Sequence, residues 1–146
     1  MDREIVEFLL RAKRASYAGN GERAEPSETG ANTFRYREGE TEYMDTYLGS
    51  FKFSGRETLR KDNLPFWVMN YVGRTVADGF SSDFLKDALS RGTDEYPYRG
   101  PLEYTSGEYS YTCSARGDFH WFYGYEVIFY RGNKAYECAF HGGDIE

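Results

Sequence analysis

The chain has 146 residues, and its 24 acidic side chains outnumber its 18 basic ones, which gives a net charge of −6. This length suits one domain with its own core, and the acidic balance argues against binding to a phosphate backbone. No apolar run approaches the ~20 residues of a membrane span. Two cysteines are too few for a disulfide framework, and the 14 Tyr, 11 Phe and 2 Trp exclude a disordered chain. We therefore expect a single cytoplasmic domain over residues 1–146, with no membrane and no direct nucleic-acid partner.

The first predicted element is a helix near the N-terminus. Ile5, Phe8 and Leu9 recur at helical spacing, and Asp2 can cap the start of the helix. The basic side chains of its last turn suit the negative end of the helix dipole. We interpret them as a solvated face: Arg11, Lys13 and Arg14.

From residue 34 the hydrophobic period changes to two, which is typical of half-buried strands. Phe51, Phe53 and Glu57 share one face of a predicted strand, and Asp62-Asn63 is a turn signal. The next strand places three large side chains on one face: Trp67, Met69 and Tyr71. A second helix follows, capped by Ser81 or Ser82, with an apolar stripe of Phe84, Leu85, Ala88 and Leu89.

Three further strands are predicted up to about residue 141, and with them the two halves of the chain match. Residues 34–76 resemble residues 102–142 in the order of glycines, acids and aromatic side chains, and a helix precedes each segment. We therefore predict an α+β fold of duplicated α-ββββ halves, with a curved antiparallel sheet covered by two helices. One extra residue near Phe122 and Tyr123 is interpreted as a β-bulge, which would keep Trp121 and Glu126 on the same face.

Several segments also resemble a bacterial domain family of unknown function. Members of that family occur alone or C-terminal to helix-turn-helix regulators of the XRE type. The resemblance implies an effector-sensing role and carries no catalytic residues. It rests on FLLRAKRASYAGNG, YMDTYLGSFKFSGRE, WVMNYVGR, DFLKDAL, YRGPLEY and GDFHWFYGYEVIFYRGNKAYECAFHGG.

Two carboxylates stand out because strand alternation points them toward the aromatic face. Glu57 follows Gly55 by two residues and Glu126 follows Gly124 in the same way, so each glycine leaves space beside an acid. An unpaired buried carboxylate costs several kcal/mol, so these acids need a partner. One hypothesis is a pocket for a small organic ligand that is cationic or donates hydrogen bonds, since either property suits the two carboxylates. Its predicted lining comprises Phe53, Trp67, Tyr71, Trp121, Tyr136 and Phe140.

The alternative is structural: each glutamate pairs with an arginine, caps a backbone amide or lies at an exposed sheet edge. The arginines available for such a pair are Arg35, Arg74 and Arg99. Zinc is disfavoured because alternation separates the four soft ligands, which are Cys113, His120, Cys138 and His141. We therefore expect no metal, no cofactor and no catalytic residue.

The favoured function is a non-enzymatic ligand-binding domain similar to the sensing part of a regulator. One alternative is a protein–protein interaction module, since Tyr and Trp are frequent at interfaces. A further alternative is a small hydrolase that uses Glu57 or Glu126 in acid–base chemistry. The sequence also leaves a homo-oligomer open.

Overall fold

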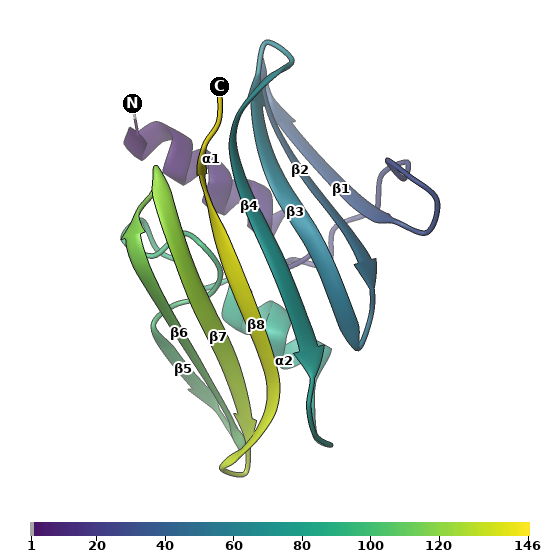
Figure 1. The fold of residues 1–146 in the computed structure, drawn as a ribbon, viewed down its shortest axis with the longest axis vertical. Coiled ribbons are helices and arrows are strands. Elements are labelled where there is room, and N and C mark those ends of the chain that lie inside the picture. The colour runs from purple at the N-terminus through teal and green to yellow at the C-terminus, as the bar shows by residue number, and fades with distance from the viewer. Residues whose placement is uncertain (1) are drawn as a thin grey trace.

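Eight strands form one continuous antiparallel sheet in the computed structural model, which describes residues 2–146 (Figure 1). The strands lie in the order β1-β2-β3-β4-β8-β7-β6-β5, so the last strand of the chain occupies the centre beside β4. Their bounds are β1 (Asn32–Glu38), β2 (Thr41–Gly49), β3 (Lys52–Lys61), β4 (Leu64–Thr75), β5 (Glu103–Ser106), β6 (Tyr109–Asp118), β7 (Trp121–Tyr130) and β8 (Asn133–Asp144).

The predicted α+β fold of duplicated α-ββββ halves covered by two helices is wrong. β4 pairs with β8 from Trp67 opposite Asp144 to Thr75 opposite Tyr136, so hydrogen bonds continue across all eight strands. The helices have 13 and 8 residues, too few to cover such a sheet, and β5 has 4 residues where β1 has 7. Alternating hydrophobicity identifies strands, but it does not reveal which strand edges pair, and the β4–β8 edge makes this a single sheet.

Helices α1 (Asp2–Arg14) and α2 (Ser82–Leu89) both lie behind the sheet in the view of Figure 1. The predicted cap of the second helix is confirmed at Ser81, whose hydroxyl accepts a hydrogen bond of 3.1 Å from the backbone N–H of Phe84. Within residues 2–146, neither helix is long and apolar enough to cross a membrane.

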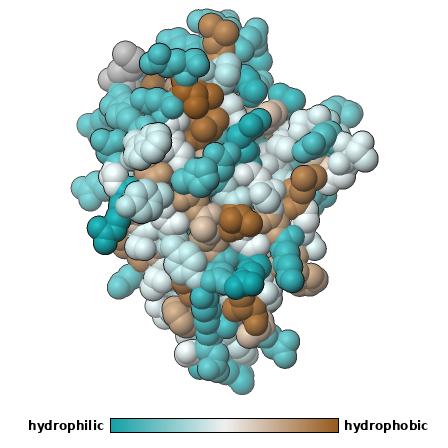
Figure 2. Space-filling model, viewed as in Figure 1, coloured by the Kyte–Doolittle hydropathy of each residue, from teal (hydrophilic) through white to brown (hydrophobic). Residues whose placement is uncertain are grey.

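The core lies between the sheet and this single layer of helices and loops. The central strands contribute Trp67, Met69 and Ile128, and helix α1 contributes Leu9, all of which are fully buried. Segment 90–102, which joins α2 to β5, adds Tyr98 to the same cluster. The opposite face of the sheet carries no covering element (Figures 1 and 2). The sheet therefore has one buried face and one open face.

The β-bulge predicted near Phe122 and Tyr123 is wrong, because β7 pairs regularly with both of its neighbours from Trp121 to Ile128. The extra residue of the second half lies in the β6–β7 turn: Gly117 pairs with Phe122, whereas Gly49 in the first half pairs with Phe53. With no bulge between them, simple alternation places Phe122, and not Trp121, on the inner face with Glu126. Trp121 is accordingly 77% exposed on the open face.

Candidate functional site

Five lysine, arginine, aspartate or glutamate side chains are buried between the inner face of the sheet and the elements behind it. Two are cations and three are acids, which is an unusual load for a core because a buried charge needs a partner. They are Lys13 on α1, Asp45 on β2, Glu57 on β3, Arg99 in segment 90–102 and Glu126 on β7.

Glu126 is fully buried and lies at the centre of the first ion pair. Arg99 donates to its Oε1 from Nη2 at 2.6 Å and from Nε at 3.1 Å. The hydroxyl of Tyr136 donates to the same oxygen at 2.7 Å, and that of Tyr111 donates to Oε2. Burial disfavours the charge of Arg99, but the attraction of Glu126 raises the pKa of that guanidinium well above its usual value. Both oxygens of Glu126 are therefore occupied.

Glu57 forms the second ion pair with the α1 lysine. Lys13 Nζ donates to Oε1 at 2.7 Å, to Oε2 at 2.9 Å and to the carbonyl oxygen of Tyr98 at 2.7 Å, which uses all three of its protons. The hydroxyl of Tyr43 also donates to Oε1, at 2.6 Å. This pair attaches both α1 and segment 90–102 to strand β3.

Asp45 is the buried acid without an ion-pair partner among residues 2–146. It lies opposite Glu57 across β2 and β3, and its Oδ1 accepts a hydrogen bond of 2.6 Å from the hydroxyl of Tyr71. Burial, reinforced by repulsion from Glu57, raises the pKa of Asp45 to about 7. Near neutral pH this side chain is therefore present in both protonation states.

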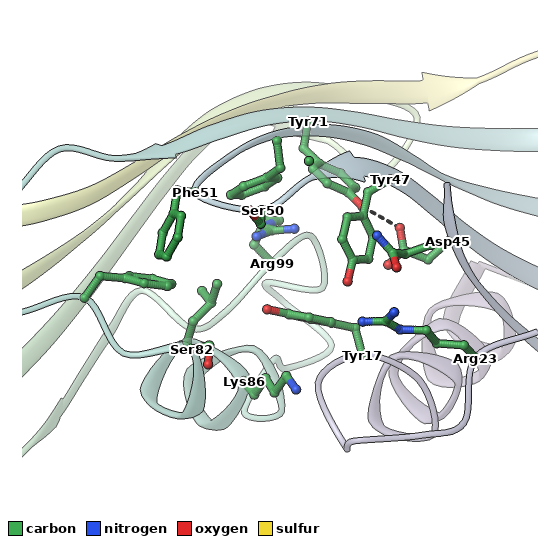
Figure 3. Close-up of a pocket in the computed structure, with 15 residues that line it drawn as sticks. Tyr17, Arg23, Asp45, Tyr47, Ser50, Phe51, Tyr71, Ser82, Lys86 and Arg99 are labelled. Carbon is green, nitrogen blue, oxygen red and sulfur yellow. Dashed lines mark hydrogen bonds between the residues drawn. The ribbon is translucent and has the colours of Figure 1, made fainter. Parts of the chain in front are cut away.

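Asp45 and Arg99 border a cavity of about 480 Å³ between α2 and the β2–β4 part of the sheet (Figure 3). Aromatic rings make up much of the wall, and two further cations, Arg23 and Lys86, line it as well. The rings belong to Tyr17, Tyr47, Phe51, Phe53, Tyr71 and Phe80. The volume falls within the range of ~300–1,000 Å³ that is usual for small-molecule sites.

Two polar atoms of buried side chains on this wall have no hydrogen-bond partner within residues 2–146, and neither atom is itself fully buried. They are the second carboxylate oxygen of Asp45 and Nη1 of Arg99, although both side chains are more than nine-tenths buried. The Arg99 guanidinium also lies 5.0 Å from the centre of the Tyr71 ring. The cavity therefore presents an acceptor and a donor that both contact one aromatic side chain, Tyr71.

The structure separates the residues predicted to form one pocket. Phe53 and Tyr71 line the cavity, and Tyr136 stacks behind them against Phe53 and Phe80. Trp67 and Phe140 are buried in the core away from it, and Trp121 lies on the open face.

Glu57 and Glu126 point inward as predicted, but each is neutralised by a cation. The partner of Glu126 is Arg99, one of the three arginines predicted as available, whereas the partner of Glu57 is Lys13, which is not among them. The space beside the two glycines is filled by protein: a Cβ on Gly55 would meet the Tyr71 hydroxyl, and one on Gly124 would meet the Phe140 ring.

Among the five buried charged side chains, sequence reasoning missed two, although a signal existed for both; it also missed the lining residues Tyr17, Tyr47 and Phe80. Lys13 stands four residues after Leu9, so helical spacing places it on the buried stripe and not on a solvated face. Asp45 alternates with Tyr43 and Tyr47, so strand parity places it on the same inward face as these tyrosines.

Comparison with known proteins gives a family and no activity. A family model described as a domain of unknown function, DUF5680, matches residues 45–145. No curated protein and no solved structure matches the chain. The matched range contains Asp45, Glu57, Arg99 and Glu126, whereas Lys13 lies outside it.

We predict that Glu126→Gln lowers the free energy of unfolding by about 3–5 kcal/mol, because Arg99 would keep a buried charge without its counter-ion. The matched control is Glu38→Gln, which removes the exposed carboxylate that Arg11 grips with two hydrogen bonds of 2.9 Å. Water can take the place of that carboxylate beside Arg11. Urea denaturation should therefore show a much smaller loss of unfolding free energy for Glu38→Gln than for Glu126→Gln. Equal losses in the two variants would contradict a structural role for the buried pair.

We also predict that Asp45→Asn becomes increasingly stabilising as the pH rises. The raised pKa of about 7, against an ordinary 3.8, means that the folded chain keeps this proton while the unfolded chain releases it. The wild type therefore loses stability from about pH 4 to pH 7, and the variant lacks this loss. Its advantage should grow by about 2–3 kcal/mol between pH 5 and pH 8. A stability difference that does not change with pH in urea titrations would refute this.

Proposed function

The chain belongs to the family of the domain of unknown function DUF5680, and on that premise we propose that it is a non-enzymatic domain that binds a small organic molecule. The site is the cavity beside Asp45 and Arg99. The observation that carries the proposal is a pair of polar atoms without a protein partner, one on each of these two buried side chains, both of which line this aromatic-walled space.

The aromatic wall supports binding of a flat, largely apolar body. Phe53 and Phe80 both stack on Tyr136, with ring centres 6.1 and 5.2 Å apart, so these rings are held in place from behind. A preformed wall reduces the entropy lost on binding, because few side chains must be ordered by the ligand. A few directed polar groups in an apolar cavity are the usual composition of a small-molecule site.

The state of the two glutamates favours binding over hydrolysis. Acid–base catalysis needs a carboxyl group that can reach the substrate and exchange its proton. Glu57 is held by Lys13 and Tyr43, and Glu126 is held by Arg99, Tyr111 and Tyr136. A catalytic role for either would first require its ion pair to break.

The proposal extends to the cellular setting. The resemblance to bacterial domains that follow XRE-type helix-turn-helix segments favours an effector sensor in the cytosol. Two free, buried cysteines, Cys113 and Cys138, suit a reducing compartment. In that setting the ligand signal would pass to a DNA-binding segment, since the acidic balance of this chain disfavours direct contact with DNA.

We predict that Ser82→Trp abolishes binding of small aromatic compounds. Ser82 is exposed at the first position of α2 and lines the cavity, so an indole there would fill the space without disturbing the core. A matched control is Asp83→Trp, which adds the same ring one residue later, at an exposed position outside the lining. Saturation-transfer NMR with a fragment library should detect hits for the wild type and the control but not for Ser82→Trp. Hits that survive in all three proteins would place binding elsewhere.

The open face of the sheet supports a second candidate, the protein-interaction module. Trp121, Tyr123 and Tyr125 project from β7 onto this uncovered face, and Val72 of β4 is exposed beside them, on the far side of Ala139. Figure 2 shows this face, on which apolar and pale residues alternate with hydrophilic ones. Exposed aromatic side chains of this kind are enriched at protein interfaces.

If that face joins two copies of the chain, wild-type protein should self-associate as its concentration rises, and Trp121→Ser should prevent it. The control is Leu64→Ser, which removes an equally exposed apolar side chain at the start of β4. Sedimentation velocity over a range of concentrations measures the self-association of the wild type and of both variants. A wild type that stays monomeric throughout would exclude self-association through this face.

A further inference from the structure

We propose that the cavity beside Asp45 and Arg99 selects an organic anion, a carboxylate on an aromatic or similarly flat apolar body, and that Asp45 takes up a proton when the anion binds. This inference rests on the proposed ligand-binding function and specifies the class of ligand. It also replaces the expectation of a cation, because the two glutamates that would have held a cation are already paired with Arg99 and Lys13.

The charges that line the cavity favour an anion. Three cations reach its wall, Arg23, Lys86 and Arg99, against the single acid Asp45. Glu126 neutralises Arg99 from behind, but Arg23 and Lys86 have no ion-pair partner within residues 2–146. Lys86 uses one proton on the side-chain oxygen of Asn20, at 2.8 Å, and its other two remain free. The lining therefore carries a net positive charge whether the Asp45 carboxyl group is protonated or ionised.

The hydrogen-bonding groups point to the same class of ligand. Arg99 offers a free N–H from Nη1, and the hydroxyls of Tyr17 and Tyr47 extend into the space between α2 and the sheet (Figure 3). No group within residues 2–146 accepts a hydrogen bond from either hydroxyl. A wall that is rich in donors suits a ligand that is rich in acceptors, and a carboxylate is acceptor-only.

Asp45 is the one group that opposes an anion, and its environment lets it change state. Ionised, it would repel a carboxylate placed against Arg99; protonated, it becomes one more donor toward the cavity. Since its pKa is raised to about 7, protonation near neutral pH costs little. The charged and titratable groups that face it are Lys13 from α1, Arg23 from the loop after α1, Tyr43 and Tyr47 from β2, Glu57 from β3, Tyr71 from β4 and Arg99 from segment 90–102.

The test compares three probes that share one body and differ in charge: 2-naphthoate, 2-naphthamide and 2-naphthylmethylamine. Isothermal titration calorimetry with the full chain gives the Kd of each at pH 6 and pH 8. The naphthoate should bind most tightly, and its Kd should rise about tenfold between pH 6 and pH 8 as Asp45 loses its proton. Titration in phosphate and in Tris, which differ in ionisation enthalpy, should show proton uptake with the naphthoate alone.

Variants test the assignment residue by residue. Asp45→Asn should bind naphthoate with the same Kd at both pH values, close to that of the wild type at pH 6. Lys86→Gln and Arg23→Gln should each weaken naphthoate severalfold and leave naphthamide unchanged, whereas Arg56→Gln, an exposed cation outside the lining, should alter neither. The buffer comparison on the wild type tests the proton uptake even if Asp45→Asn fails to fold.

The possible failures can be told apart. Equal or tighter binding of the amine or the amide, lost in Ser82→Trp, would overturn the anion inference and leave the ligand-binding function standing. Naphthoate binding without proton uptake would overturn the role of Asp45. If none of the three probes binds, or if binding is unaffected in Ser82→Trp, both the inference and the proposed function fall.

Discussion

The ion pair between Arg99 and Glu126 holds the loop behind the sheet in place, and much of the inner architecture depends on it. Glu126 lies on β7, beside the central strand β8, and Arg99 comes from a segment with little regular structure of its own. The same segment is held a second time where Lys13 reaches the carbonyl oxygen of Tyr98. Two helices of 13 and 8 residues leave part of the sheet bare, and these polar contacts allow an irregular loop to close the core.

This arrangement also explains why one acid remains without a counter-ion. Two cations serve three buried carboxylates, and the geometry gives both cations to the glutamates, which leaves Asp45 with only the hydroxyl of Tyr71. Burying an acid in this way lowers stability at neutral pH, and a stable fold has no need of it. Such a cost beside a cavity is typical of functional sites, where stability is exchanged for chemistry.

The sequence revealed local features better than long-range ones. The Ser81 cap, the Asp62-Asn63 turn and the inward direction of both glutamates depend on neighbours within a few residues, and the structure has all three. The edge between β4 and β8 joins residues about seventy positions apart, and no local pattern specifies it. Trp121 was misplaced because the extra residue of the second half lies in the β6–β7 turn and not inside β7, and the sequence does not mark which of the two places holds it. The prediction of the site was the least accurate part. The charge of Lys13 suggested a solvated face, whereas its position on the helix places it on the buried stripe.

The central position of β8 has a consequence for how the protein is made. β4 leaves the ribosome long before β8, so its inner edge waits without a pairing strand until residues 133–144 have been synthesised. Until then the nascent chain exposes two unfinished sheet edges, on β4 and on β7, and both invite pairing with other chains. Chaperone protection during translation should therefore matter more for this protein than its modest length suggests.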